Sequence, residues 1–570
     1  MASNAQNTVD LDLVLKRYAK AEQRDYQIAC IKDTVNLINK HSDVLIDLPT
    51  GTGKTLCYSP IVAEIAENGH RSLVLTATKQ AQRRVSLEIN KFLEKLRTTI
   101  IYGVTEYQCP ILNGKAENWC CAENINEYCR KSNTQCEVIR SEAQYSGDEI
   151  VVTNFSKFLL ARGGRKYDII VLDDSHSFEN TKEQAYQITI QGAAARKFYE
   201  NGITDGRIKT LIEEFLNLFV EIFSRCVTPK DKEGTIPQEY LVRLAKLVTK
   251  KDEDRLKQFI RYLSEPYRSV YCSIYYFLKR CRSSSKYRFY VRSDFYEPED
   301  WDSSELISRR DDLVEFVIKK RFGDSRVIYV TATPGDPVAH AGSCTLRDYT
   351  RLKLVVTPSD KSAFQDIDNW FRKLNIIVVQ DIGDTRQLNL FEKAINLTVQ
   401  VLSAIPERAL VLFKNYRDQR KANDFLSKIF PPEKLFFIDA SLQDADFVEE
   451  LASKSRISLA SASSTLWEGI NIDKLRLTVI VSPPFIRPCV GKTQTYPHLE
   501  RRMLIRLQQG IGRTIRGPRD FGVAVLMDGR FVAYVRRKNF SEYLRKRVVV
   551  AKSAEVTPLV NEMFKEWSRT

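Results

Sequence analysis

A glycine-rich segment near the N-terminus, residues 47–55 (DLPTGTGKT), constrains the fold more than any other feature of the sequence. It follows the short apolar run 44–46 and opens a longer helical segment, which is the setting that a phosphate-binding loop requires. Leu48 stands where Gly or Ala is usual, and the alternative interpretation is a glycine-rich turn. We predict a nucleotide site whose loop residues are Pro49, Thr50, Gly51, Thr52, Gly53, Lys54 and Thr55.

Two acidic residues, Asp173 and Asp174, complete the predicted site. They follow the apolar run 169–172, so they lie at the end of a predicted strand. We expect Asp173 to hold Mg²⁺ together with the Thr55 hydroxyl, and Asp174 to position the attacking water. Asp174 is one methylene shorter than the Glu that is common there, which predicts slower hydrolysis or the use of a second water. The alternative is an acidic turn that caps the next helix.

A third motif, residues 509–516 (QGIGRTIR), lies far along the chain. Arg513 and Arg516 are three residues apart, so they share one face of a helix. A planar guanidinium group suits the stabilisation of a transferring phosphoryl group. Together with the phosphate loop, the arginines predict a cleft between two sheets that closes on ATP. The predicted catalytic residues are Lys54, Asp173, Asp174, Arg513 and Arg516.

Short apolar runs, each followed by a longer amphipathic segment, recur along the chain as parallel α/β architecture requires. Five runs fall in each half, and a region of mixed polarity around 355–384 separates them. Two sheets account for this pattern better than one. Two segments interrupt the first half, a cysteine-rich one at 102–144 and a mostly helical one at 177–325. The length of 570 residues agrees with about four domains.

The twelve cysteines are distributed unevenly along the chain. Five of them lie in the segment 102–144, namely Cys109, Cys120, Cys121, Cys129 and Cys136. In so long a chain this clustering favours a metal site over a disulfide framework. A set of thiolates alone suits an iron–sulfur cluster. A Cys₄ zinc site and unligated core thiols are the alternatives.

The composition is that of a globular protein with an excess of basic residues. Lys and Arg number 87 against 72 Asp and Glu, a net charge of +15. Residues 501–552 alone carry 14 basic and 3 acidic side chains, which favours a polyanion partner over a solvated helix face. No apolar run approaches the ~18 residues of a spanning helix, and the polar start MASNAQNTVD lacks the apolar core of a signal peptide. We therefore expect an intracellular protein without a membrane partner, in the cytoplasm or nucleoid, or in the nucleus of a eukaryote.

These motifs together resemble a superfamily 2 helicase, and in detail the iron–sulfur XPD/DinG family, over nearly the whole chain and in the correct order. In the first half, the matching elements are Arg24 and Gln27 of RDYQ (adenine side), 76–78 (TAT, DNA backbone), 173–176 (DDSH, the DEAH motif) and 331–333 (TAT, coupling). In the second half, they are 411–416, 467–471 (WEGIN), 509–516 and 521–528.

The resemblance implies two RecA-like motor domains of α/β fold, with a cysteine-rich iron–sulfur insertion and a mostly helical arch insertion in the first. The expected boundaries are 1–101, 145–176 and 326–360 for the first motor domain, 102–144 for the iron–sulfur insertion, 177–325 for the arch and 361–570 for the second motor domain. The further ATP-binding residues that it implies are Arg24, Gln27, Glu468, Gly469 and Gln509.

A [4Fe–4S] cluster is also implied by the resemblance. Its expected ligands are Cys109, Cys120, Cys129 and Cys136. The family's frequent CxxC spacing is missing, and because neighbouring cysteines cannot easily both bind one cluster, Cys121 is the alternative to Cys120. We expect His176 to form a hydrogen-bonding link toward Gln509 rather than to bind a metal, because it has no HxxxH or CxxH partner nearby.

The function implied by the resemblance is an ATP- and Mg²⁺-dependent helicase that translocates 5′ to 3′ on single-stranded DNA. It would act as a monomer on tailed or forked duplexes, with the cluster domain as the separating wedge, in DNA repair or replication-linked processing. Two other functions stay open. One is a nucleic-acid-binding assembly or damage-recognition module with a weak ATPase, and the other is a helicase that acts on RNA–DNA hybrids.

Three further features of the sequence bear on function, and the first two have two interpretations each. Tyrosines interleave with basic residues in 261–296, and they either stack on bases or pack between helices. Trp467 is either a cleft residue or a core aromatic. A C-terminal basic group is predicted to contact the DNA backbone, and its members are Arg536, Arg537, Lys538, Arg545, Lys546 and Arg547.

Overall fold

The structure is a computed structural model of the 570-residue chain. It describes residues 8–21, 24–40, 42–48, 52–109, 114–116, 136–160, 166–203, 205–228, 231–249, 256, 259–264, 267–293, 301–332, 336–349, 354–357, 368–369, 371–437, 445–462, 467, 472, 474–485, 496–515 and 520–568.

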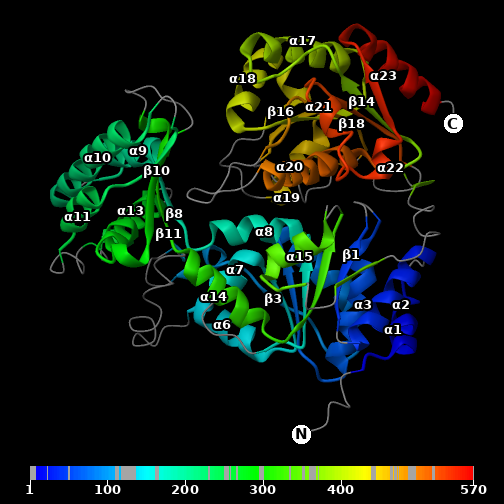
Figure 1. The fold of residues 1–570 in the computed structure, drawn as a ribbon, viewed down its shortest axis with the longest axis horizontal. Coiled ribbons are helices and arrows are strands. Elements are labelled where there is room, and N and C mark those ends of the chain that lie inside the picture. The colour runs from blue at the N-terminus through cyan, green and yellow to red at the C-terminus, as the bar shows by residue number, and fades with distance from the viewer. Residues whose placement is uncertain are drawn as a thin grey trace.

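The first motor domain is built on a parallel sheet of seven strands (Figure 1). In spatial order they are β13 (Leu354–Thr357), β1 (Asp43–Asp47), β12 (Arg326–Thr331), β7 (Ile169–Asp173), β2 (Ser72–Thr76), β6 (Ile150–Asn154) and β3 (Thr99–Ile101). The helices around it are α1 (Leu11–Tyr18), α2 (Asp25–Asn39), α3 (Lys54–Glu67), α4 (Lys79–Asn90), α6 (Glu137–Gly147), α7 (Phe155–Leu160), α8 (Ser175–Gln184), α14 (Asp311–Phe322) and α15 (Pro337–Thr345). The central strands are buried on both faces, which explains their continuous apolar runs.

The second motor domain contains another parallel seven-stranded sheet. Its order is β16 (Leu435–Phe437), β17 (Ile457–Ser461), β15 (Arg408–Phe413), β18 (Leu475–Ile480), β19 (Gly522–Leu526), β14 (Leu374–Val379) and β20 (Val548–Ala551). The main helices are α17 (Leu388–Ala404), α18 (Tyr416–Leu426), α19 (Ala445–Lys454), α20 (Tyr496–Ile511), α22 (Glu542–Arg545) and α23 (Ser553–Ser568). Each of the ten predicted apolar runs overlaps a strand, so the two-sheet prediction is confirmed.

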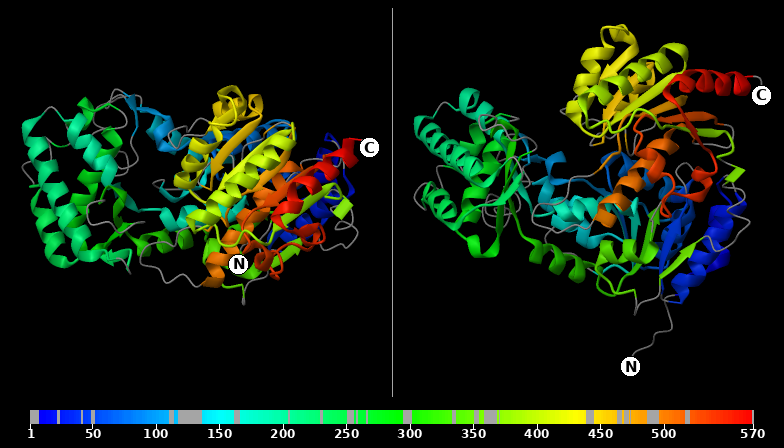
Figure 2. Two further views of the ribbon diagram at one scale, coloured as in Figure 1. Left: turned by 90° about the horizontal axis from the view of Figure 1, so that it is seen from above. Right: turned by 45° about the horizontal axis from the view of Figure 1, so that its top comes forward.

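The arch insertion lies to one side of the two motor domains (Figure 2). It contains helices α9 (Gly192–Asn201), α10 (Gly206–Cys226), α11 (Gln238–Lys246) and α13 (Tyr267–Cys281). The sequence prediction of a mostly helical segment missed an antiparallel sheet, whose strands in spatial order are β8 (Ile188–Gln191), β11 (Ser304–Arg309), β10 (Arg288–Ser293) and β9 (Glu233–Thr235). Strands β8 and β9 are short and lie far along the chain from their partners β11 and β10, so their pairing has no local signal.

Two helices inside the predicted 177–325 segment belong structurally to the first motor domain. Helix α8 contacts α7 and α15, and α14 contacts the same two helices. The arch has a hydrophobic core of its own, which also includes Cys109 and Cys136 of the cysteine-rich segment. No helix among the described residues is long and apolar enough to cross a membrane.

Candidate active site

The phosphate loop meets α3 at Gly53 and Lys54. Gly53 has φ +78°, a left-handed backbone that glycine adopts without strain. A methyl group at this position would collide with the side-chain amide nitrogen of Gln27. Gly53 is the N-cap and Lys54 the first residue of α3, so the backbone N–H groups of the first helical turn surround Lys54. Pro49, Thr50 and Gly51 lie outside the described residues.

Residues at the start of α2 contact the phosphate loop through side-chain hydrogen bonds. The Gln27 side-chain amide donates to the carbonyl oxygens of Thr52 and Gly53 at 2.8 and 3.3 Å. The Tyr26 hydroxyl donates to the same Thr52 oxygen at 2.7 Å, and Arg24 donates to the Tyr26 hydroxyl at 3.1 Å. Arg24 and Gln27, predicted from RDYQ, thus lie beside the loop, and sequence reasoning missed the tyrosine between them, although it stands inside the same motif.

The predicted carboxylates lie at the end of β7. Asp173 is its last residue, and Asp174 follows as the N-cap of α8 with φ +53°, a strained value for a residue other than glycine. Burial raises the pKa of Asp173 to about 7, the neighbouring Asp174 adds to the rise, and the Lys54 ammonium opposes it. Lys54 thus lies within electrostatic reach of Asp173, as a phosphate-transfer site requires.

A second acidic residue of the first domain has a similar electrostatic environment. Asp47 ends β1 just before the loop, and burial raises its pKa to about 7 while Lys54 lowers it. Tyr543 of α22 in the second motor domain is also influenced by Asp47, and burial raises the pKa of this phenol. Neither residue is predicted from the sequence to belong to the site. Both lie where the motor domains approach each other.

The second motor domain reaches the site through α20. The Gln509 side-chain amide donates to Nε2 of His176 at 2.6 Å, and Nδ1 of His176 lies 3.5 Å from the Thr331 hydroxyl at the end of β12. The expected link between His176 and Gln509 is therefore present. It connects the coupling motif, the acidic turn and the second motor domain.

Arg513 is buried next to the same interface. Its Nε donates to the carbonyl oxygen of Trp467 at 3.0 Å, and the Trp467 indole N–H donates to the carbonyl of Arg506 at 2.9 Å. Trp467 itself is fully buried, so the core interpretation is correct for it. Arg513 thus contacts its own domain here. Glu468, Gly469 and Arg516 lie outside the described residues.

Two of the predicted cluster cysteines are described. Cys109 ends β4 (Gln108–Cys109), Cys136 is the N-cap of α6, and both are buried and free of disulfides. The backbone N–H of Gln108 donates to the Glu137 carboxylate at 3.1 Å, so the two cysteine-bearing segments lie next to each other. Cys120, Cys121 and Cys129 lie outside the described residues, and the described part of the chain contains no group of three metal-ligating side chains.

Most of the interleaved aromatic residues in the arch are structural. Tyr271, Tyr275 and Tyr276 are buried in the arch core, and Arg280 donates to the carbonyl oxygens of Tyr186 and Ser308. For these residues the packing interpretation is correct. Tyr262 differs from them because it is 83% exposed.

The comparisons with known proteins agree with this geometry. Residues 398–547 match the family model for a helicase C-terminal domain, and residues 20–200 match the model for the res subunit of type III restriction enzymes. A solved structure described as an XPD helicase superposes with a TM-score of 0.66 at 15% identity, over 93% of this chain and 100% of the other. The chain therefore has two RecA-like α/β domains in an XPD-like fold, and the two family matches support a superfamily 2 helicase.

Two further relatives match most of the length of the chain, and a third matches part of it. A probable ATP-dependent helicase of Methanocaldococcus jannaschii is 23% identical over 614 residues, which cover 89% of this chain and 90% of the relative. The structure of Xpd4 from S. tokodaii has a TM-score of 0.55 at 12% identity, over 93% of this chain and 100% of the other. The ATP-dependent DNA helicase YoaA of Haemophilus influenzae is 23% identical over 192 residues, 30% of this chain and 28% of the relative.

Proposed function

We propose that this helicase uses ATP and Mg²⁺ to translocate 5′ to 3′ on single-stranded DNA and to open tailed or forked duplexes as a monomer. The observation that carries the proposal is the hydrogen bond from Gln509 to His176, because it connects the second motor domain to the turn that contains Asp173. ATP binding would draw the motor domains together, and hydrolysis would release them. The polarity rests on the family resemblance, and the choice of DNA is supported by the excess of 15 positive charges.

The residues at the phosphate loop fit Mg²⁺, which prefers oxygen ligands. The Thr55 hydroxyl and the Asp173 carboxylate would hold the ion, whose charge would offset the charge that develops on the transferring phosphoryl group. Lys54 would bind the terminal phosphates, and Asp174 would orient the attacking water. Arg513 and Arg516 are proposed to stabilise the same phosphoryl group from the other side of the cleft, which for Arg513 requires release from the Trp467 carbonyl.

Strand displacement tests the function and the polarity together. We expect the wild type to open duplexes with 5′ tails faster than those with 3′ tails, and Lys54→Ala to open neither. A preference for 3′ tails would contradict the polarity. Equal displacement of DNA duplexes and RNA–DNA hybrids would contradict the choice of DNA.

A [4Fe–4S] cluster is proposed on Cys109 and Cys136 with Cys120 and Cys129, where it would stiffen the segment that acts as the wedge. Two buried thiols on adjacent segments support this assignment. Protein purified without oxygen should hold about four iron atoms per chain. Cys136→Ser should lose them, whereas Cys281→Ser, in the arch core outside the cysteine-rich segment, should retain them. Colourless protein with stoichiometric zinc would contradict the cluster.

A second candidate is a nucleic-acid-binding module with a weak ATPase. The contact of Arg513 with the Trp467 carbonyl and the short side chain of Asp174 favour it. The two candidates differ in DNA-stimulated phosphate release. Rates of the wild type and Lys54→Ala that do not differ would support the module, and a wild-type rate that falls to background in the variant would support the helicase.

A further inference from the structure

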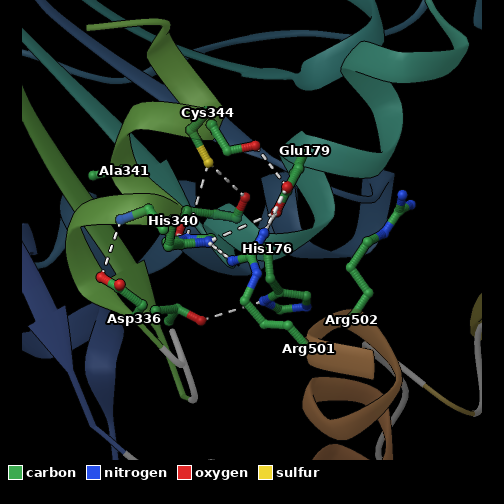
Figure 3. Close-up of polar contacts among 12 residues, drawn as sticks. His176, Glu179, Asp336, His340, Ala341, Cys344, Arg501 and Arg502 are labelled. Carbon is green, nitrogen blue, oxygen red and sulfur yellow. Dashed lines mark hydrogen bonds and ion pairs between the residues drawn. The ribbon is translucent and has the colours of Figure 1, made fainter. Parts of the chain in front are cut away.

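A second polar connection between the motor domains is formed by Arg501, Glu179 and His340 (Figure 3). It accompanies the bond from Gln509 to His176. Arg501 of α20 donates from Nη2 to both carboxylate oxygens of Glu179 on α8, at 2.7 and 2.8 Å. Its Nη1 lies 3.4 Å from Nδ1 of His340 on α15. Arg501, Glu179 and His340 are all buried, so water does not compete for these contacts.

His340 extends this connection to the acidic turn. Its Nε2 lies 2.7 Å from the hydroxyl of Ser175, the residue directly after Asp174. A guanidinium group has only donors, so Nδ1 of His340 accepts from Arg501 and Nε2 carries the proton that Ser175 accepts. Burial lowers the pKa of His340 to about 3 and keeps the ring neutral, as this arrangement requires.

Ser175 departs from the motif that this turn resembles. The third residue of DEAH is alanine, and this chain has serine there, fully buried. Alanine has no side-chain acceptor for a proton from His340. A buried polar group without a partner costs free energy, so the serine and the histidine depend on each other.

We propose that Ser175, His340 and Arg501 form a relay of positioning residues that couples closure of the motor domains to the conformation of the Asp173–Asp174 turn. The strained backbone of Asp174 needs neighbouring contacts to hold it. The bond between His340 and Ser175, the next residue along the chain, is one of them. When the motor domains separate, Arg501 moves away from His340, and Nδ1 of His340 loses the donor that fixes its tautomer. The inference rests on the proposed function, because it concerns how ATP turnover follows domain motion.

Substitutions of His340 in the full-length chain test the relay. His340→Leu keeps the volume but removes both ring nitrogens, whereas His340→Gln restores one donor and one acceptor. We expect His340→Leu to lower the DNA-stimulated kcat about tenfold with a change in the KM for ATP below about twofold, and His340→Gln to recover at least about a third of the wild-type rate. Equal rates of the two variants would overturn the relay.

Thr345→Val is the matched control. It also removes a buried hydrogen-bonding group from α15, but the Thr345 hydroxyl contacts Tyr329 and the carbonyl of Ala341, both within the first motor domain. Its kcat should stay at the wild-type value. A fall in kcat as large as that of His340→Leu would show a general effect of α15 packing and would overturn the relay.

A double-mutant cycle and a closure measurement complete the test. Ser175→Ala and Arg501→Met break the same relay, so their effects on kcat should not add, and additive effects would contradict it. A wild type without DNA-stimulated ATP turnover would refute the proposed function instead. The relay is then tested by fluorescence energy transfer between the motor domains, where His340→Leu should raise the ATP-analogue concentration for half-closure about fivefold. Unchanged closure would overturn the relay.

Discussion

Gly53 shows how one residue sets the geometry of the nucleotide site. Its left-handed backbone turns the loop into α3, and its missing side chain leaves room for the Gln27 amide, which donates to the loop carbonyls. Two demands therefore meet at one position, a backbone conformation and a close approach. Gly69, which follows the C-cap residue of α3, meets only the first of them, since φ is +82° but no atom lies within 4 Å of the position of a Cβ atom.

The comparison of Gly53→Ala with Gly69→Ala separates these two demands. Both variants should lose about 1 kcal/mol of unfolding free energy from backbone strain. Only Gly53→Ala should also raise the KM for ATP, by about tenfold, because Gln27 must move. Thermal unfolding and ATP titration of the two proteins measure the effects. An equal KM in both variants would show that the Gln27 contact has no role in binding.

A second prediction at this scale concerns pH. The neutral, buried His340 keeps a pKa of about 3, so between pH 6.5 and that value the unfolded chain binds a proton that the folded chain does not. Stability therefore falls with acidification over this range. The titratable groups that face the ring are Glu179, Arg501, His176, Lys182 and Cys344. From pH 7 to pH 5 the stability advantage of the wild type over His340→Gln should shrink by about 2 kcal/mol. Unfolding at both pH values measures it, and a constant difference would contradict the prediction.

At the scale of an element, the members of the C-terminal basic group differ in the contacts they make within the protein. Arg545 donates to the carbonyl oxygens of Val535, Arg537 and Phe540, and it thereby fixes the turn before α22. Arg547 in the same way holds Asp368 and the carbonyl of Phe371. These bonds give both arginines a structural role within the second motor domain, and their contact with DNA stays a prediction. Arg537 pairs with Glu500 and Lys546 with Glu542, whereas Arg536 and Lys538 are exposed.

Substitutions in this segment should therefore divide into two classes. Arg545→Ala should cost about 2 kcal/mol of unfolding free energy through its lost carbonyl bonds, with no change in the salt dependence of DNA binding. The double variant Arg536→Ala, Lys538→Ala should keep its stability and reduce the slope of log affinity against log salt by about 1.4 for single-stranded DNA. Binding titrations at several salt concentrations distinguish the classes. A reduced slope of log affinity against log salt in Arg545→Ala would show that Arg545 contacts DNA.

At the scale of the whole molecule, two parallel sheets meet through helices rather than through strands. Figure 1 shows α8 and α15 of the first motor domain facing α20 of the second. Arg501 and Arg502 on α20 pair with Glu179 and Glu183, one turn apart on α8. Buried pairs of this kind are costly to break on one side only, so they favour the contact state over partial separation.

Arg502→Met should shift the motor domains toward separation, because Glu183 would keep a buried charge without this partner. The contact between the motor domains should lose about 3 kcal/mol of stability, little changed in 1 M salt because the pair is buried. Energy transfer between the domains should then report a wider interdomain distance. Arg243→Met, which removes an exposed Arg–Glu pair in the arch, is the control and should leave the interdomain distance unchanged. An unchanged interdomain distance in Arg502→Met would show that the pair does not hold the domains together.

The sequence by itself determined the two parallel sheets, the phosphate loop and the acidic turn. Each is a local pattern, an apolar run with turn residues at fixed spacing, so nearby residues suffice to reveal it. It also predicted the Gln509–His176 bond, because the family's motifs bring those residues to one cleft. The resemblance assigned no such role to His340.

Only the tertiary structure decided the antiparallel sheet of the arch, the use of Arg545 and Arg547, and the Ser175–His340–Arg501 relay. These depend on segments far apart in sequence: 165 residues separate Ser175 from His340, and 161 separate His340 from Arg501. A serine, a histidine or an arginine gives no local sign of the partner that folding brings to it. The packing of the sheets and helices decides which donor meets which acceptor. Burial then strengthens each hydrogen bond, because the local dielectric constant is lower than that of water.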